Sequence, residues 1–173
     1  SLTNYIRNPL QFYMQRILRI NEADEVEENI AVNTLGTIIH NALEELYTPY
    51  QNQFLALHHI EAMEAKIDEV ILKHFKEIYK EGEITKGKNL LAFEVAKRNV
   101  YNFLQLEKKD IEADQAIKVL LLEASLSCEI EMKSLPFPIK IAGKVDRIEE
   151  RNGAIRIIDY KTGKVDGNSL KIQ

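Results

Sequence analysis

The 173-residue sequence predicts an α/β domain in which a mixed β-sheet packs against helices that form the N-terminal half. Three observations support this fold class. Apolar residues recur with a helical period of about 3.6 up to residue 110, and the period then changes to two. Asn152-Gly153 separates two β-branched arms, which is typical of a hairpin. We therefore expect one domain over 1–173, helical over 1–110 and sheet-forming over 116–173.

Four helices are expected, each with an apolar stripe along one face. Pro9 suits the first position of the first helix. Asn33 or Thr34 can cap the second, and Pro49 ends it. The approximate bounds of the four helices are 9–20, 33–48, 58–80 and 89–107.

Three consecutive strands are expected over about 117–132, 139–149 and 154–161. If Asn152 and Gly153 form a two-residue loop, the register places Asp146 directly across from Asp159. Like charges in this position are destabilising, so a cation between them would explain the pair.

Lys161 lies two residues after Asp159 and therefore shares its face of the strand. Two carboxylates and a lysine suit a divalent metal that binds a phosphate. The alternative is a surface hairpin in which Asp146 and Asp159 pair with Lys144 and Lys161.

His40 lies on the second predicted helix, one turn after Gly36. Helical side chains lean toward the N-terminus, so the glycine leaves room over the imidazole. A close crossing of helix and sheet would also explain it. Glu44 could orient the ring through its other nitrogen. The alternative is a hydrogen-bonded histidine at the boundary of the core.

Charge and composition restrict the function classes. The net charge is −4, yet residues 133–173 carry nine Lys/Arg and five Asp/Glu, so positive charge gathers where a phosphate backbone could lie. The lone Cys128 excludes an internal disulfide and an iron–sulfur cluster ligated by this chain's cysteines. No apolar run could span a bilayer and no signal segment is present, so we expect a cytoplasmic protein without membrane association.

Four motifs follow one another in order: Gly36-x-x-x-His40, then Glu123, then Gly143-x-Val145-Asp146-Arg147, then Ile157-Ile158-Asp159-Tyr160-Lys161-Thr162-Gly163. Together they resemble the nuclease domain of RecB-type exonucleases, in the PD-(D/E)XK phosphodiesterase superfamily. Tyr5-x-x-Asn8-Pro9-x-x-Phe12-Tyr13 is similar to the segment with which that domain begins. The resemblance thus runs from Leu2 to the C-terminus.

The resemblance implies a restriction-endonuclease-like core and metal-dependent hydrolysis of DNA, in repair or recombination. His40, Asp146 and Asp159 would ligate Mg²⁺ or Mn²⁺, with the carbonyl of Tyr160 as a further ligand. Lys161 would position or activate the hydrolytic water. Glu123 matches an upstream catalytic acid of the family; the alternatives are a group that supports the ligands or a strand residue in a salt bridge.

The chain departs from the family pattern at two places. Asn8 stands where many relatives have a cysteine, which implies a version without the iron–sulfur cluster. The family's downstream helix with Gln and Tyr has no counterpart before Gln173, so we expect a C-terminally truncated fragment that binds DNA weakly or is inactive.

The expected partners are DNA, with little sequence specificity, and the helicase or other domains of a larger repair protein. Two other functions stay open. One is a non-catalytic nucleic-acid-binding domain of a helicase–nuclease complex, and the other is a helical module that docks a partner.

Overall fold

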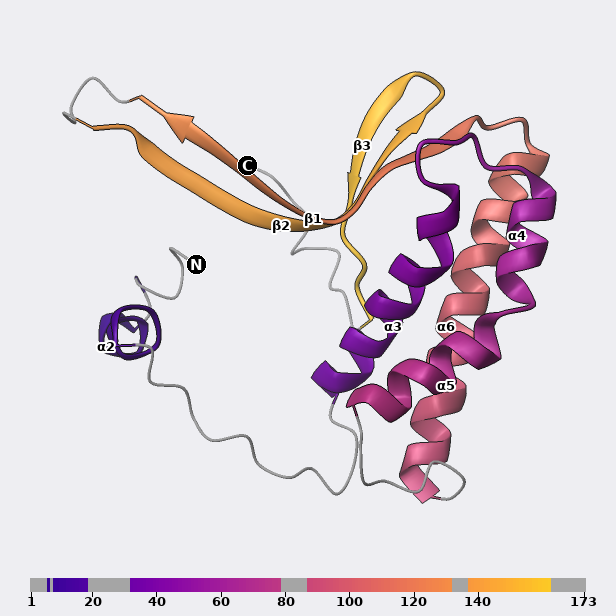
Figure 1. Cartoon of the computed structure of the whole chain (residues 1–173), viewed down its shortest axis with the longest axis horizontal. Helices are drawn as coiled ribbons and strands as arrows, with labels where there is room; N and C mark the ends of the chain where they lie inside the picture. The colour runs from indigo at the N-terminus through magenta and orange to yellow at the C-terminus, as the bar shows by residue number, and fades with distance from the viewer. Residues whose placement is uncertain (1–5, 7, 19–31, 79–86, 132–136, 163–173) are drawn as a thin grey trace.

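The computed structural model describes residues 6, 8–18, 32–78, 87–131 and 137–162. Within these residues, helices α3 to α6 form one layer, and a three-stranded sheet extends away from it (Figure 1). The strand order is β1-β2-β3 and both pairings are antiparallel. The predicted α/β class, with a sheet against helices, is confirmed.

The helices have the following bounds: α2 Pro9–Phe12, a π-helix Tyr13–Ile17, α3 Val32–Tyr47, a 3₁₀ turn Thr48–Tyr50, α4 Leu57–Glu64, α5 Ile67–Ile78 and α6 Gly87–Glu112. Helix α3 begins before Asn33 and Thr34, so neither residue is its cap. Ile20, the expected end of the first helix, lies outside the described residues. No described helix is long and apolar enough to cross a membrane.

The single helix predicted over 58–80 is wrong, because the structure has two helices there. The backbone N–H of Lys66 donates to the carbonyl of Met63, three residues back, which closes a tight turn. Met63 and Ile67 on either side are both buried. The apolar stripe therefore continues through the turn, and periodicity alone could not reveal it.

The strands are β1 Ile117–Ile130, β2 Ile139–Arg151 and β3 Ala154–Ile158. Asn152 and Gly153 form the expected two-residue turn, both with positive φ, and Arg151 pairs with Ala154. The predicted register is confirmed up to the pair Arg147–Ile158. The predicted strand end at residue 161 is wrong, because pairing stops one residue before Asp146 and Asp159 would meet.

The core lies between the helices and the inner half of the sheet. Helix α3 is its centre, with Ile38 and Ala42 fully buried, and β1 contributes Ile117 and Val119. The outer halves of β1 and β2 form a two-stranded ribbon away from the helices (Figure 1). The side chains of residues 125–130 in this ribbon are exposed in the described structure.

Candidate metal centre

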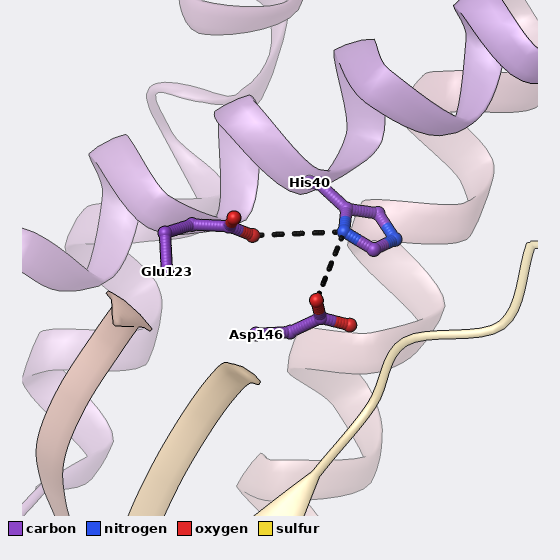
Figure 2. A group of neighbouring side chains, drawn as sticks. All are labelled: His40, Glu123 and Asp146. Atoms are coloured by element: carbon purple, nitrogen blue, oxygen red, sulfur yellow. Dashed lines mark ion pairs between the residues drawn. The ribbon is translucent and has the colours of Figure 1, made fainter. Parts of the chain in front are cut away.

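Three side chains from three elements converge where the ribbon meets the helices (Figure 2). They are His40 on α3, Glu123 on β1 and Asp146 on β2. One ligand atom from each lies within 4.8 Å of the other two. The side chains are 25%, 12% and 14% exposed, respectively, so the group is partly buried but accessible.

The imidazole of His40 has a defined orientation. Its Nε2 lies 3.1 Å from the carbonyl oxygen of Tyr160. A carbonyl can only accept, so Nε2 carries a proton, and Nδ1 is the ring nitrogen that is left to face the two carboxylates. Nδ1 lies 3.6 Å from Glu123 Oε1 and 3.5 Å from Asp146 Oδ1. The Tyr160 carbonyl, rather than Glu44 as the sequence suggested, is thus the group that orients the ring.

Gly36 makes room for the segment that follows β3. A Cβ built on Gly36 would lie 3.2 Å from Oγ1 of Thr162. The glycine therefore allows residues 160–162 to approach α3, which keeps the Tyr160 carbonyl beside His40. The close approach at Gly36 is made by the segment that follows β3, and not by a strand of the sheet as the expected helix–sheet crossing would require.

Glu123 adopts an unusual backbone conformation for a strand residue, with φ of 45°. The neighbouring pairs, Leu122–Arg147 and Ala124–Val145, place it across from Asp146. The cross-strand acid pair is therefore Glu123 with Asp146, and the expected pairing of Asp146 with Asp159 does not form.

The two oxygens of the Glu123 carboxylate have different surroundings. Oε2 lies 2.5 Å from Nζ of Lys144. Oε1 is buried, has no hydrogen-bond partner among the described residues, and faces His40. A buried carboxylate oxygen without a donor is costly, and a cation at this point would satisfy it.

Asp146 is held by the backbone after β3. Its Oδ2 accepts a hydrogen bond of 2.6 Å from the N–H of Tyr160. This bond takes the chain out of the sheet before residue 159 and leaves Oδ1 directed at His40. The backbone of Tyr160 therefore orients two members of the group, its N–H holding Asp146 and its carbonyl holding His40.

The donor set fits a divalent cation. In an octahedral site with metal–ligand distances of about 2.1 Å, neighbouring ligands are roughly 3.0 Å apart and opposite ones roughly 4.2 Å. The distances from Nδ1 to the two carboxylates, 3.5 and 3.6 Å, are about half an ångström longer than the neighbouring-ligand distance, so small side-chain movements would close the site on an ion. Two carboxylate oxygens and one imidazole nitrogen are ligands that Mg²⁺ or Mn²⁺ can accept.

Asp159 and Lys161 lie beside this group, directly after β3. Nζ of Lys161 is 2.5 Å from Oδ2 of Asp159, and the side chains are 62% and 59% exposed. The hydrogen bond to Asp159 raises the pKa of Lys161, and the charge of Asp146 adds to the shift, so the lysine is a cation at neutral pH. The structure thus brings His40, Glu123 and Asp146 together, while the Asp159 carboxylate binds Lys161.

The ring of Tyr160 forms the inner wall of the site. It packs edge-on against His40, with ring centroids 5.6 Å apart, and against Phe103, at 5.1 Å. Burial raises the pKa of its hydroxyl to about 12, so this ring is neutral.

The sequence reading missed the role of Lys144 as the partner of Glu123. The residue lies two positions before Asp146, on the same side of β2. This spacing was a usable signal, but the strand register of β1 was needed to identify Glu123 as its partner.

The chain is similar to one protein family and to several proteins of Rickettsia species. A family model described as the PD-(D/E)XK nuclease superfamily matches residues 1–172. The chain is 26% identical over 174 residues to an uncharacterized protein of Rickettsia felis. It is 25% identical over 174 residues to uncharacterized proteins of Rickettsia conorii and Rickettsia typhi.

Each of these alignments covers 95% of this chain and 18–19% of the relative, so the chain spans about a fifth of the length of these relatives. No solved structure matches the chain.

Proposed function

Because the chain belongs to the PD-(D/E)XK nuclease superfamily, we propose that it is a metal-dependent nuclease that hydrolyses phosphodiester bonds in DNA. The observation that carries this proposal is the convergence of His40, Glu123 and Asp146 within 4.8 Å. Two carboxylates placed across from each other are destabilising on their own. A bound cation turns this repulsion into attraction.

The proposed ligands are Nδ1 of His40, Oε1 of Glu123 and Oδ1 of Asp146. We propose Mg²⁺ or Mn²⁺ as the ion, since carboxylates suit both ions. Such an ion supplies Lewis-acid polarisation of the phosphate and lowers the pKa of a bound water. Tyr160 contributes through its backbone. Its carbonyl and its N–H keep Nδ1 of His40 and Oδ1 of Asp146 directed at one point.

Lys161 and Asp159 are assigned from the motif resemblance and from their position. Lys161 would hold its ammonium beside the attacking water and offset negative charge on the phosphate. Asp159 would serve as a further carboxylate ligand. Its position, one residue before the backbone that orients His40 and Asp146, supports this role.

The finer assignment is a RecB-type exonuclease that acts in DNA repair beside helicase or other domains of a longer protein. It rests on the order of the four motifs. That the chain spans 18–19% of its rickettsial relatives is consistent with such further domains.

The test is cleavage of linear single-stranded and double-stranded DNA with Mn²⁺. Replacing His40, Asp159 or Lys161 by Ala, or Asp146 by Asn, is expected to lower the rate by about 10²–10⁴-fold, because each removes a ligand or the ammonium. His58→Ala, on α4, is the matched histidine control and should cleave like wild type. Equal rates in wild type and all four site variants would contradict the proposal.

One observation favours a second candidate, a non-catalytic nucleic-acid-binding domain. The Asp159 carboxylate binds Lys161 and lies outside the three-residue group. Such a domain would bind DNA equally well in EDTA and in Mn²⁺, and His40→Ala would leave that affinity unchanged. A nuclease of the kind proposed would instead bind and cleave DNA only with the metal.

A further inference from the structure

A cluster of buried charges lies directly behind the candidate centre. Arg147 follows Asp146 on β2 and is completely buried, at 0% exposure. Its Nη2 lies 2.7 Å from Oε1 of Glu107 on α6 and 2.5 Å from Oε2 of Glu149 on β2. Both carboxylates are buried as well. The residues of this buried charge cluster are Arg147, Glu107 and Glu149.

The cluster connects the layers of the domain. The Arg147 guanidinium lies over the ring of Tyr47 on α3, 4.7 Å from its centroid, and 5.9 Å from that of Phe103 on α6. The hydroxyl of Tyr47 donates to Oε2 of Glu107. One guanidinium group therefore contacts both α3 and α6 from β2.

Each element that supplies one of the three converging side chains is tied to this cluster. Helix α3 carries His40 about two turns before Tyr47. Strand β2 carries Asp146 next to Arg147, and β1 carries Glu123 next to the residue that pairs with Arg147. The Tyr160 ring, which packs on His40, also packs on Phe103 beside the guanidinium.

The energetics argue that this cluster does more than stabilise the fold. Charges taken out of water lose several kcal/mol of hydration each, and replacing a buried ion pair by apolar residues is often neutral or stabilising. Burial raises the pKa of Glu107 although Arg147 and Tyr47 both contact it, so the desolvation of this carboxylate is not fully offset. What an apolar side chain could not supply is directional contact with both helices at once.

We propose that Arg147 is a positioning residue, which sets β2 against α3 and α6 so that Asp146 and Glu123 meet His40 at the distances a metal requires. This inference rests on the proposed metal-dependent function. It does not make Arg147 a ligand, since the side chain is fully buried behind the centre.

The test separates stability from positioning. In Arg147→Met, buried Glu107 loses its cation and Glu149 keeps only Arg151, whose Nε lies 2.9 Å from Oε1, and the melting temperature is expected to fall by roughly 10 °C. In the triple variant Arg147→Met/Glu107→Gln/Glu149→Leu, no buried charge of the cluster remains and the glutamine still accepts from Tyr47. Arg151 loses Glu149 but keeps its ion pair with Asp110. The melting temperature of the triple variant should return to within a few degrees of wild type.

The deciding readout is the dissociation constant for Mn²⁺, measured by calorimetry without DNA. The triple variant is expected to bind Mn²⁺ about 10–100-fold more weakly than wild type, the usual cost of losing a residue that supports metal ligands. Wild-type affinity in a triple variant of wild-type stability would overturn the inference.

Arg147→Lys is a second variant that tests the inference if the triple variant does not fold. Lysine keeps the charge but cannot reproduce the planar contacts of guanidinium. Weaker Mn²⁺ binding by folded Arg147→Lys supports the inference, and unchanged binding overturns it. A wild-type chain that binds no Mn²⁺ would overturn the proposed function as well, so the two failures are distinguishable.

Discussion

At the scale of single residues, Glu123 is the most constrained member of the centre. Its positive φ, rare outside glycine, costs of order 1–3 kcal/mol in a non-glycine residue, and such strain is commonly stored at functional sites. Lys144 holds one oxygen of its carboxylate, and the other faces His40 without a hydrogen-bond donor. The contact with Lys144 therefore determines which oxygen is presented to the centre.

Replacing Lys144 by Met should weaken Mn²⁺ binding by up to about 10-fold, because the Glu123 carboxylate becomes free to turn away. Lys144 is largely exposed, so the substitution should leave the melting temperature nearly unchanged. Calorimetric titration with Mn²⁺ is the measurement. Lys140→Met, on the same strand, is the control and should bind like wild type.

The opposite result is equally informative. If Lys144 acted only as a counter-ion that competes with the metal, removing its charge would strengthen Mn²⁺ binding. Tighter binding in Lys144→Met would therefore contradict the positioning role.

At the scale of elements, the start of α4 depends on a histidine. Ala56 is the N-cap and has no side-chain acceptor, but Nδ1 of His59 accepts the N–H of Ala56 at 3.2 Å. Burial lowers the pKa of His59, and the neighbouring His58 lowers it further. The neutral ring is the form that can accept this hydrogen bond, so protonation breaks the cap.

The sign of the pH dependence follows from this lowered pKa. The folded chain binds a proton to His59 less readily than the unfolded chain, whose pKa is about 6.5. The contribution of the cap is therefore complete above pH 6.5 and is lost as the pH falls from there through the folded pKa.

His59→Gln keeps an acceptor at this position but does not titrate. Its free energy of unfolding should consequently fall less than that of wild type between pH 7.5 and pH 5, by up to about 1 kcal/mol. Urea unfolding at the two pH values measures the difference. His58→Gln keeps the titrating cap and should retain a pH-dependent loss. Parallel pH profiles for wild type and His59→Gln would show that the cap does not titrate.

At the scale of the whole molecule, the candidate centre lies where the helical layer meets the sheet (Figure 1). The three side chains that converge there come from α3, β1 and β2. Unfolding must separate these elements, so a metal that binds all three stabilises the folded chain by mass action.

Mn²⁺ at about 100 times its dissociation constant should add about 2.7 kcal/mol of stability and raise the melting temperature by roughly 5–10 °C. Thermal unfolding with and without Mn²⁺ measures this shift, and EDTA should reverse it. Glu123→Gln and His40→Ala should each lose most of the increase. The same increase in both variants would indicate that Mn²⁺ binds elsewhere.

Much of the fold was predictable from local patterns. Periodicity identified the helices and strands, and the Asn152-Gly153 turn predicted the register of β2 and β3 because a two-residue loop leaves one geometry. His40 and Asp146 were predicted as members of one site, and the structure places them together.

The resemblance named Glu123 only as an upstream catalytic acid, and the tertiary structure decided that Glu123, and not Asp159, lies across from Asp146. In β1 the register with β2 shifts at Leu120, whose carbonyl accepts from the side chain of Gln51. This shift sets Glu123 across from Asp146. The bulged residue thus contacts a side chain 69 positions earlier in the chain, and no local pattern in β1 predicts that contact.

The position at which β3 ends was also set by tertiary contacts. The N–H of Tyr160 donates to the Asp146 side chain and not to a neighbouring strand. Asp159 is therefore not paired in the sheet, and its carboxylate binds Lys161. By itself, the sequence determined where the helices, the strands and the hairpin turn lie along the chain, because propensity and turn chemistry act over a few residues. Which oxygens meet around His40 was determined by competition among hydrogen-bond donors that only the folded chain brings together.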